Sequence, residues 1–469
     1  MNPHSAEATG PTRTTSSPFH RRIAIRSAIL ITVLGVAQAA PVGHPPIPGL
    51  PASQSYKLRI DGVPVAVNDE SDFDFHTAFF SMDEPVTVEV EFPGDASHAS
   101  VHPLRHGIKP KVVDNTISFR LEKPLKLVIR TEGMLPLALC ATPVEREIPE
   151  PGEPHVLYFG PGVHEPGLIE PVSGQTVYLA AGALVKGRIE TRDATGVTIR
   201  GRGTLDSRGF SVRDDKTHAV LFERCKDVHL EGIGIRGGSW WMTLFLLTKD
   251  ASATHLSLLG KTVNTDGIDI DGAENFVARD CFIRCEDDGF GWHAVDAEAN
   301  GQPPTRDCLA EDCVIWNTGW GNGLRVGASM ETDLFENITF RNIDVLEHAG
   351  AAIYSDHSDW ALCRNIRFEN FFIESRGKKD RPVINIYIAK TRYSNATGFR
   401  DERGHYDGLE FVRVFAPAGT SVQLTGHSDA HRIENVLFGH CRLGNEPIDG
   451  PEDIETNEFV GPVRFETAG

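Results

Sequence analysis

Residues 264–292 read NTDGIDIDGAENFVARDCFIRCEDDGFGW, and this stretch decides the fold of the chain. Asp266 lies in an Asn-Thr-Asp-Gly turn, and the doublet Asp287 and Asp288 follows 21 residues later. A glycine and a short strand-like run follow each acidic turn. If these 21 residues form one coil of a stacked solenoid, the second turn lies about 4.8 Å from the first. The sequence therefore predicts that the three carboxyl groups share one patch of surface.

Three carboxylates at that spacing cannot all stay ionised without a free-energy cost, so the pKa of at least one should rise. A protonated carboxyl beside ionised ones suits acid/base cleavage of a glycosidic bond. Aspartates also cap turns in solvent, which is the alternative interpretation for any one of the three. Because all three fall on adjacent coils with aromatic residues nearby, we predict that Asp266, Asp287 and Asp288 are catalytic.

A degenerate eight-residue unit recurs on both sides of this stretch. Its first, third, sixth and eighth positions are mostly apolar, and its fifth is Gly, Asp, Asn or His, which take a positive φ at low cost. Each unit thus predicts two short strands that meet at a one-residue bend. A long interval before the last unit leaves room for one more coil near Leu409. The units are VTIRGRGT from Val197, VHLEGIGI from Val228, LSLLGKTV from Leu256, FVARDCFI from Phe276, CLAEDCVI from Cys308, ITFRNIDV from Ile338, IRFENFFI from Ile366 and VLFGHCRL from Val436.

These repeats predict an all-β fold. Strand pairs repeated at such intervals are typical of a parallel β-helix, which we assign to residues 155–469. The Leu and Asn spacing of a leucine-rich solenoid is absent, and the helices that a doubly wound fold needs are almost absent. Residues 56–150 instead alternate apolar and polar positions, as in Val86, Val88 and Val90, and predict a small antiparallel β-sandwich before the solenoid.

The start of the chain predicts export. Residues 1–39 have the layout of a secretory signal peptide, with arginines before the apolar run ILITVLGVAQA and a small-x-small end at Ala37–Ala39. The run is too short for a comfortable membrane span, so we expect a secreted protein, extracellular or periplasmic, without stable membrane insertion. An uncleaved anchor is the alternative. Residues 40–55 are rich in proline and predict an extended linker.

The formal net charge of −19 repels polyanions, which argues against nucleic acid and mildly against acidic polysaccharides as partners. The eight cysteines show no zinc signature. We expect most of them to be buried, with Cys281 and Cys313 at equivalent repeat positions, and one or two disulfides remain open. We predict no metal site and no cofactor, and we expect a monomer.

Aromatic and polar side chains gather in the coils around the acidic turns, and all six tryptophans fall between residues 240 and 360. Indole rings stack on the apolar faces of sugars, whereas stacking in the core is the alternative for each ring. The side chains that we predict to bind a polysaccharide or oligosaccharide are Trp241, Asn264, Trp292, His293, Trp320, Asn322, Arg325, Tyr354, Asp356 and His357.

The order NTDG, Asp-Asp doublet and Gly-x-Gly strand resembles the right-handed β-helix glycoside hydrolases of family 28, the polygalacturonases, and family 49, the dextranases and isopullulanases. The resemblance covers roughly residues 155–375 and implies a pectin-lyase-like solenoid; a β-sandwich before it is more like family 49. It also implies that Asp287 is the general acid, that Asp266 and Asp288 hold and deprotonate the water, and that the anomeric centre inverts. No cofactor is implied.

The sequence departs from the polygalacturonases at two motifs. Their Gly-His-Gly is Gly321-Asn322-Gly323 here, so His293 or His357 would have to replace the missing histidine. Their Arg-Ile-Lys motif, which binds the uronate carboxylate, is replaced by AAIYSDHSD. A neutral α-glucan such as dextran is therefore slightly favoured as substrate. A basic pocket formed by Arg325, Lys390 and Arg392 would instead favour pectic uronates.

Two other functions fit the same solenoid. In a polysaccharide lyase the aspartates would bind Ca²⁺ and a basic residue would abstract a proton. In a non-catalytic carbohydrate-binding module the sugar would bind unchanged. The fold alone does not separate these possibilities.

Overall fold

The computed structural model describes residues 41–466 except 296, 379 and 397, and these belong to one compact unit. The predicted signal peptide lies outside the described residues. The described part of the chain is almost entirely β-structure, with one four-residue α-helix, α1 (Ala297–Asn300), and the 3-10 turns η1 (Ser71–Phe73), η2 (Leu104–His106) and η3 (Pro451–Asp453). In these ranges no helix has the length and apolar character needed to cross a bilayer. The all-β prediction is confirmed.

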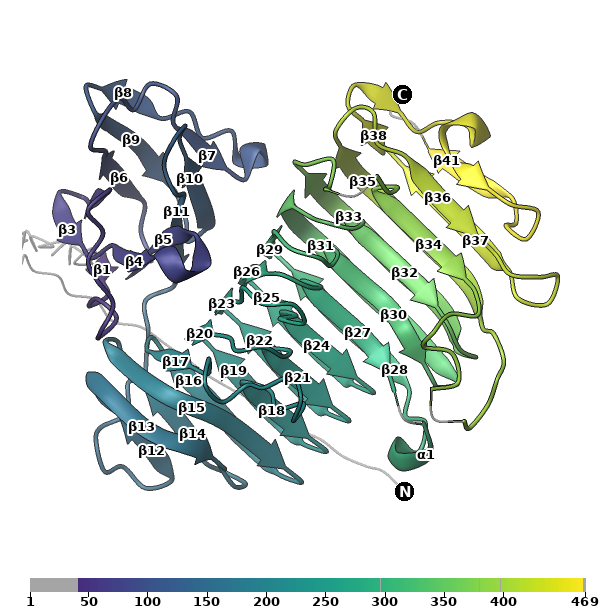
Figure 1. Ribbon diagram of the computed structural model, residues 1–469, viewed down its shortest axis with the longest axis horizontal. Helices are drawn as coiled ribbons and strands as arrows, with labels where there is room; N and C mark the ends of the chain where they lie inside the picture. The colour runs from purple at the N-terminus through teal and green to yellow at the C-terminus, as the bar shows by residue number, and fades with distance from the viewer. Residues whose placement is uncertain (1–40, 296, 379, 397, 467–469) are drawn as a thin grey trace, which may run out of the picture. The chain divides into compact units, whose positions relative to one another are not determined.

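Residues 42–142 form two sheets (Figure 1). Apolar side chains of both sheets share one buried core. We predicted antiparallel pairing throughout this region. The prediction is wrong for one pair of strands, β5 and β11, which run parallel. One sheet contains β1 (Val42–Gly43), β4 (Asn68–Glu70), β5 (Phe75–Ser81), β7 (Ser100–His102), β10 (Lys126–Arg130) and β11 (Leu137–Thr142). The other contains β2 (Lys57–Ile60), β3 (Val63–Val65), β6 (Val86–Glu91), β8 (Lys111–Val113) and β9 (Thr116–Leu121).

The chain from residue 156 onward forms a 30-stranded sheet that coils into a parallel β-helix with three ladders of stacked strands (Figure 1). The first ladder contains β12 (Val156–Phe159), β14 (Thr176–Leu179), β16 (Thr195–Gly201), β19 (Lys226–Glu231), β22 (Lys249–Thr254), β25 (Glu274–Arg279), β28 (Thr305–Glu311), β31 (Leu334–Glu347), β33 (Leu362–Ile373), β35 (His405–Ala416), β37 (Ile433–Gly439) and β41 (Val463–Glu466).

The second ladder follows the bend in each coil and the third ladder carries the strands nearest the acidic turns. The second contains β17 (Thr204–Asp206), β20 (Gly234–Arg236), β23 (Ser257–Leu259), β26 (Phe282–Cys285), β29 (Val314–Asn317), the second halves of β31, β33 and β35, and β38 (Arg442–Leu443), which pairs with β39 (Glu446–Pro447). The third contains β18 (Val220–Glu223), β21 (Thr243–Leu246), β24 (Ile268–Asp271), β27 (Phe290–Ala294), β30 (Leu324–Met330), β32 (Ile353–His357), β34 (Ile384–Ile388), β36 (Val422–Thr425) and β40 (Glu455–Thr456). The strands β13 (Gly162–Ile169) and β15 (Ala183–Arg192) start both ladders.

The predicted bend residues have positive φ in seven of the eight units, from 52° at Asp280 to 134° at Gly201. The coil expected near Leu409 is present, with Arg413 at its bend. The third unit was aligned wrongly: Phe276 stacks on Ala251, five residues before Leu256, and His255 takes the positive φ instead of Gly260. The small Ala251 and Ala253 hid this strand, because a strand without large apolar residues has a weak period-two signal.

Inside the β-helix, large side chains stack from coil to coil. Eight phenylalanines and one tryptophan form a column with neighbouring ring centroids 4.3 to 6.2 Å apart: Phe222, Phe245, Phe276, Trp292, Phe340, Phe368, Phe411, Phe438 and Phe465. The eight cysteines are all buried and free, so the possible disulfides are not formed. Cys281 and Cys313 are fully buried in the core, as expected from their repeat positions.

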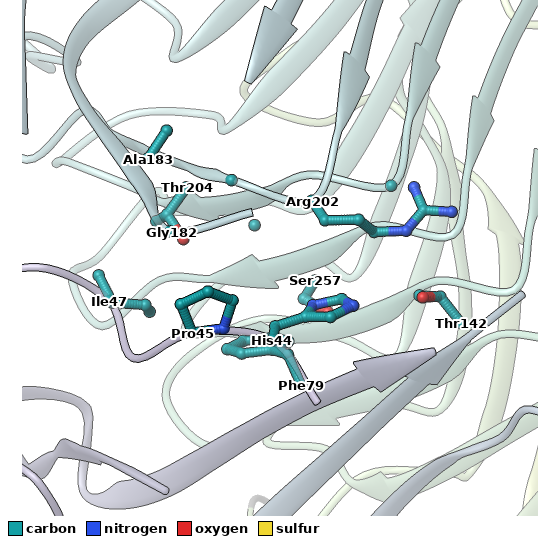
Figure 2. A pocket seen from close by; sticks show the side chains of 13 residues that line it. His44, Pro45, Ile47, Phe79, Thr142, Gly182, Ala183, Arg202, Thr204 and Ser257 are labelled. Atoms are coloured by element: carbon teal, nitrogen blue, oxygen red, sulfur yellow. The ribbon is translucent and has the colours of Figure 1, made fainter. Parts of the chain in front are cut away.

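The segment predicted as an extended linker is packed. Val42 and Gly43 pair with β5, and the buried His44 ring lies within hydrogen-bond distance of the Ser81 hydroxyl, at 2.9 Å. Figure 2 shows His44 and Pro45 across a small cavity from Arg202. The cavity measures about 20 Å³, room for one water molecule. The prolines therefore lie in an ordered part of the compact unit.

Buried apolar side chains connect the N-terminal sheets to the second ladder. Phe73 and Phe75 pack with Phe282 and Trp316 in one buried cluster. Trp316 is therefore buried in this cluster.

Candidate active site

The three predicted catalytic aspartates lie in the turns that join the second ladder to the third. Asp266 precedes β24, and Asp287 and Asp288 precede β27, one coil further along. One carboxyl oxygen from each of them lies within 4.8 Å of the others. The expected clustering of the carboxyl groups is therefore present, which follows from the register of neighbouring coils.

Glycines after the acidic turns allow the coils to approach closely. A Cβ atom on Gly267 would lie 2.3 Å from the carbonyl oxygen of Gly289, and a Cβ on Gly289 would lie 2.5 Å from that of Gly323. The amide of Gly267 donates to the carbonyl of Asp288 at 2.9 Å. Any side chain at these glycines would push neighbouring turns apart, so the glycines set the spacing of the carboxyl groups.

Asp288 is held by the next coil. The backbone N–H and the side-chain amide of Asn322 both donate to Asp288 Oδ1, at 2.8 and 2.7 Å, and Arg325 Nη1 lies 3.6 Å from Oδ2. Asn322 in turn accepts a hydrogen bond from the backbone of Ala351 at 2.9 Å. These donors fix the orientation of the Asp288 carboxyl group. Asn322, predicted to bind substrate, thus faces the groove but is engaged with Asp288.

Asp266 lies in a different environment. It is almost fully buried, and its Oδ1 has no hydrogen-bond partner among the described residues. Burial raises the pKa of Asp266 well above its usual range, and repulsion from the carboxylates of Asp269, Asp287 and Asp288 raises it further. The surroundings of Asp266 therefore favour its neutral form, while Asp287 is half-buried at the groove surface.

A groove of about 640 Å³ opens over the three aspartates and extends over consecutive coils, from Trp240 in one turn to Tyr393 in a later loop. Eight of the ten predicted substrate-binding residues line it: Trp241, Asn264, His293, Trp320, Asn322, Arg325, Tyr354 and Asp356. Neighbouring strands lie about 4.8 Å apart, close to the length of one sugar unit, so a chain of several sugars fits along the coils.

Two predicted binding residues are wrong. Trp292 is fully buried in the aromatic column, 4.3 Å from the ring of Phe340. His357 is also fully buried, with Nε2 2.8 Å from the carbonyl oxygen of Ala361. Alternation along a strand explains both, because Phe290 and Trp292 face inward while Gly291 and His293 face outward. The same alternation puts His357 inside and Asp356 on the groove side.

Sequence analysis predicted Arg392 only as part of a basic pocket, and it did not predict the other large aromatic and arginine side chains of the lining. Tyr387 pairs with Asp356 in the next coil, so an extension of the repeat alignment would have found it. The others lie in loops outside the repeat, where sequence carries no positional signal. The unpredicted large side chains are Arg213, Trp240, Arg381, Tyr387 and Tyr393.

The predicted basic pocket is mostly neutralised. Arg325 makes a two-pronged ion pair with Asp356, with Nε to Oδ1 at 2.9 Å and Nη2 to Oδ2 at 2.5 Å. Lys390 pairs with Asp401 and does not line the groove. Arg325 is therefore neutralised by Asp356. Exposed Arg213, Arg381 and Arg392 remain at its rim.

Known proteins resemble this chain in structure rather than in sequence. No protein-family model and no curated protein sequence matches it. Among solved structures, Dex49A from Penicillium minioluteum matches with a TM-score of 0.63 and 13% identity, covering 90% of this chain and 96% of that chain.

Two further solved structures match with TM-scores too low to carry an argument. A hyperthermoactive exopolygalacturonase from Thermotoga maritima has a TM-score of 0.40 and 14% identity, covering 66% of this chain and 83% of that chain. The catalytic domain of a GH87 alpha-1,3-glucanase has a TM-score of 0.44 and 11% identity, covering 91% and 89%. At such identities the likeness shows the fold: this chain is similar to right-handed parallel β-helix glycoside hydrolases.

Proposed function

We propose that this protein is a glycoside hydrolase that cleaves α-glycosidic bonds of a polysaccharide or oligosaccharide. The observation that carries the proposal is the cluster of Asp266, Asp287 and Asp288 at the floor of an elongated groove. Protonated and ionised carboxyl groups within a few ångströms of one another provide the acid and the base that acetal hydrolysis requires. Glycosidases with the same fold support this choice, and we expect the enzyme to act outside the cytoplasm.

The proposed roles follow the environments of the three groups. Asp287, half-buried at the groove surface, protonates the leaving oxygen. Asp288, which Asn322 and Arg325 hold in place, takes a proton from the water that attacks the anomeric carbon. Asp266 helps to orient that water. Asp287 gives one proton to the leaving oxygen and Asp288 gains one from the water, and transfer of that proton through the cluster back to Asp287 restores the acid for the next turnover.

Inversion is the proposed stereochemical outcome, although the oxygen spacing alone would not select it. Inverting enzymes usually separate their two carboxyl groups by about 6.5–9.5 Å and retaining enzymes by about 5–5.5 Å. The nearest oxygens here lie within 4.8 Å. We nevertheless propose inversion because Asp266 and Asp288 together can bind a water beside Asp287. Proton NMR of the first product resolves this: a product with the anomeric configuration of the substrate would contradict the mechanism.

The substrate is proposed to be a neutral α-glucan such as dextran. The Arg325–Asp356 ion pair occupies the cation that lies at the centre of the groove among the described residues, so this arginine is not free to bind a uronate carboxylate. Incubation with dextran, pullulan, polygalacturonate and arabinogalactan tests this proposal through the reducing ends released. Faster hydrolysis of polygalacturonate than of every neutral polymer would instead assign the rim arginines to uronate binding. Binding without any release of reducing ends from the panel would favour a carbohydrate-binding module.

A lyase is the second candidate, because the three carboxylates could also hold a cation. Calcium prefers six to eight oxygen ligands, and a calcium-dependent lyase releases an unsaturated product that absorbs in the ultraviolet. For the proposed hydrolase we expect EDTA at about 5 mM, roughly fiftyfold above the lowest calcium dissociation constants of extracellular modules, to leave the rate unchanged within about twofold. Loss of activity with EDTA that calcium restores, together with rising ultraviolet absorbance, would establish the lyase instead.

A further inference from the structure

A fourth carboxyl group lies beneath the groove and takes no part in the mechanism above. Asp269, in β24, is fully buried, and neither of its carboxyl oxygens has a hydrogen-bond partner among the described residues. Buried carboxyl groups without partners are costly and rare in folded proteins. Ile268 and Ile270 on either side of Asp269 point into the core, so its own side chain faces the groove side of the strand. This residue therefore needs a role.

The adjacent strand leaves room for Asp269. Gly291 lies directly opposite in β27, and a Cβ atom there would lie 2.0 Å from Asp269 Oδ1 and 2.7 Å from His293 Nε2. The missing side chain of Gly291 thus opens the space through which Asp269 faces His293. The distance from Asp269 Oδ1 to His293 Nε2 is 3.7 Å, slightly longer than a hydrogen bond.

The second nitrogen of His293 fixes which atom carries the ring proton. Nδ1 lies against the carbonyl oxygen of Gly327, which can only accept, so Nδ1 carries the hydrogen. Burial, and then the charge of Arg325, lower the pKa of His293 to about 3, so the ring is neutral and Nε2 presents a lone pair. Burial, and then the neighbouring carboxylates, raise the pKa of Asp269 well above its usual range, which favours its protonated form. The carboxyl O–H of Asp269 therefore faces the lone pair of His293 Nε2.

His293 supports the aromatic wall of the groove. The Trp241 ring stacks on it at 5.3 Å with an angle of 20°, and Trp240 stacks on Trp241 at 5.4 Å with an angle of 10°. Both indoles are partly exposed and line the groove, whereas the imidazole is buried beneath them. The position of the outer rings thus depends on how firmly His293 is held.

We propose that Asp269 is a positioning residue for sugar binding. When Asp269 and His293 move closer than the observed 3.7 Å, the carboxyl O–H of Asp269 donates to His293 Nε2. This hydrogen bond fixes the His293–Trp241–Trp240 stack against which the substrate binds. The inference rests on the proposed glycosidase function. Asp269 does not touch the reacting atoms, and it acts only through His293. Its effect should therefore fall on substrate binding more than on the chemical step.

Two substitutions separate this role from simple packing. Asp269→Asn keeps the size and supplies an N–H donor, whereas Asp269→Leu keeps the size and removes the donor. Near-ultraviolet circular dichroism reads the stacked Trp240–Trp241 pair directly, without substrate. We expect the signal of the stacked indoles to persist in the Asn variant and to be lost in the Leu variant. If the Leu variant does not fold, Asp269→Ser, which is too short to reach His293, takes its place.

Kinetics on the best polymer of the panel provide the second measurement. We expect the Leu variant to raise KM about tenfold with kcat changed less than about threefold, and the Asn variant to keep both within about threefold. As a control, Asp344→Asn removes another buried carboxyl, which pairs with Arg105 outside the groove, and should leave KM unchanged.

Several outcomes would overturn the proposal. They are an unchanged indole signal and KM in the Leu variant, an Asn variant as impaired as the Leu variant, or a loss confined to kcat. If no polymer is hydrolysed, the proposed function fails, but the circular dichroism comparison still decides whether Asp269 holds the stack. The two failures are therefore distinguishable.

Discussion

Replacing Asp287 by asparagine is expected to lower kcat/KM on an unactivated polysaccharide by about a thousandfold, within the range of 10² to 10⁴ attributed to general acid catalysis. The amide has the size of the carboxyl group but cannot deliver a proton to the leaving oxygen. Because Asp287 is half-buried at the groove surface, the substitution should leave folding intact. Release of reducing ends gives the rate, and a thermal melt gives the folding control.

The leaving group provides the sharper version of this test. An aryl glycoside with an acidic phenol needs no proton on departure, so the Asp287→Asn variant should hydrolyse it far better, relative to the wild type, than it hydrolyses the polymer. Asp333→Asn, at an exposed carboxyl outside the groove, serves as the matched control. More than a few per cent of wild-type activity on the polymer would argue against Asp287 as the acid. If Asp266→Asn alone showed the leaving-group dependence, the acid would be Asp266, whose pKa burial raises well above its usual range.

The second large effect concerns stability. Arg236, in β20, is buried with its partners, and its guanidinium donates to Glu70 at 2.8 Å and to Asp206 at 2.9 Å. Glu70 belongs to the N-terminal sheets and Asp206 to the β-helix, so one cation joins the two regions. Arg236→Met leaves two buried carboxyl groups without this partner, and we expect a loss of about 3–5 kcal/mol in the free energy of unfolding.

The control for Arg236 is an exposed arginine with similar partners. Arg224 pairs with Asp193 at 2.7 Å, but both side chains are well exposed, so Arg224→Met should cost about 1 kcal/mol or less. Urea denaturation of both variants gives the comparison. Equal losses would show that burial does not set the strength of the Arg236 contacts. Combining Arg236→Met with Glu70→Gln should recover part of the loss, because no charge then remains on Glu70.

Glu70 also gives this contact a pH dependence. Burial is the largest cause that raises the pKa of Glu70 to about 7, from 4.5, while Arg236 opposes the rise. A carboxyl with a raised folded-state pKa binds its proton more tightly in the folded chain. Its contribution is present below pH 4.5 and is lost as the pH rises through about 7. The Glu70→Gln variant should therefore lose less stability than the wild type between pH 5 and 8.

Much of the site followed from the sequence because it depends on local repeats. The spacing of Asp266 and Asp287 by one coil was enough to predict that their carboxyl groups meet, since strand separation in a ladder is fixed. The bend residues were predictable for a similar reason: only a few residue types take a positive φ cheaply. The predicted alignment of the repeats was wrong at Ala251, because the small side chains of this strand gave no clear apolar pattern.

The alternation of side chains along each strand could have shown which residues face the groove, but the predictions for Trp292 and His357 did not use it. Trp292 and His293 are neighbours on one strand, so only one of them can face the groove. The larger apolar ring, Trp292, points into the core. Counting inward positions from Phe290 would have excluded Trp292, and counting from Ile353 would have excluded His357.

The coiled β architecture, the bends and the meeting of three aspartates could be predicted from the residues alone, because each of these arises from a short repeat acting within one coil or between neighbours. The folded structure was needed to show that burial raises the pKa of Asp266, that Asp356 pairs with Arg325, and that Asp269 faces His293 above Gly291. Those properties depend on burial and on distances between residues far apart in the chain, and neither is encoded in a local pattern.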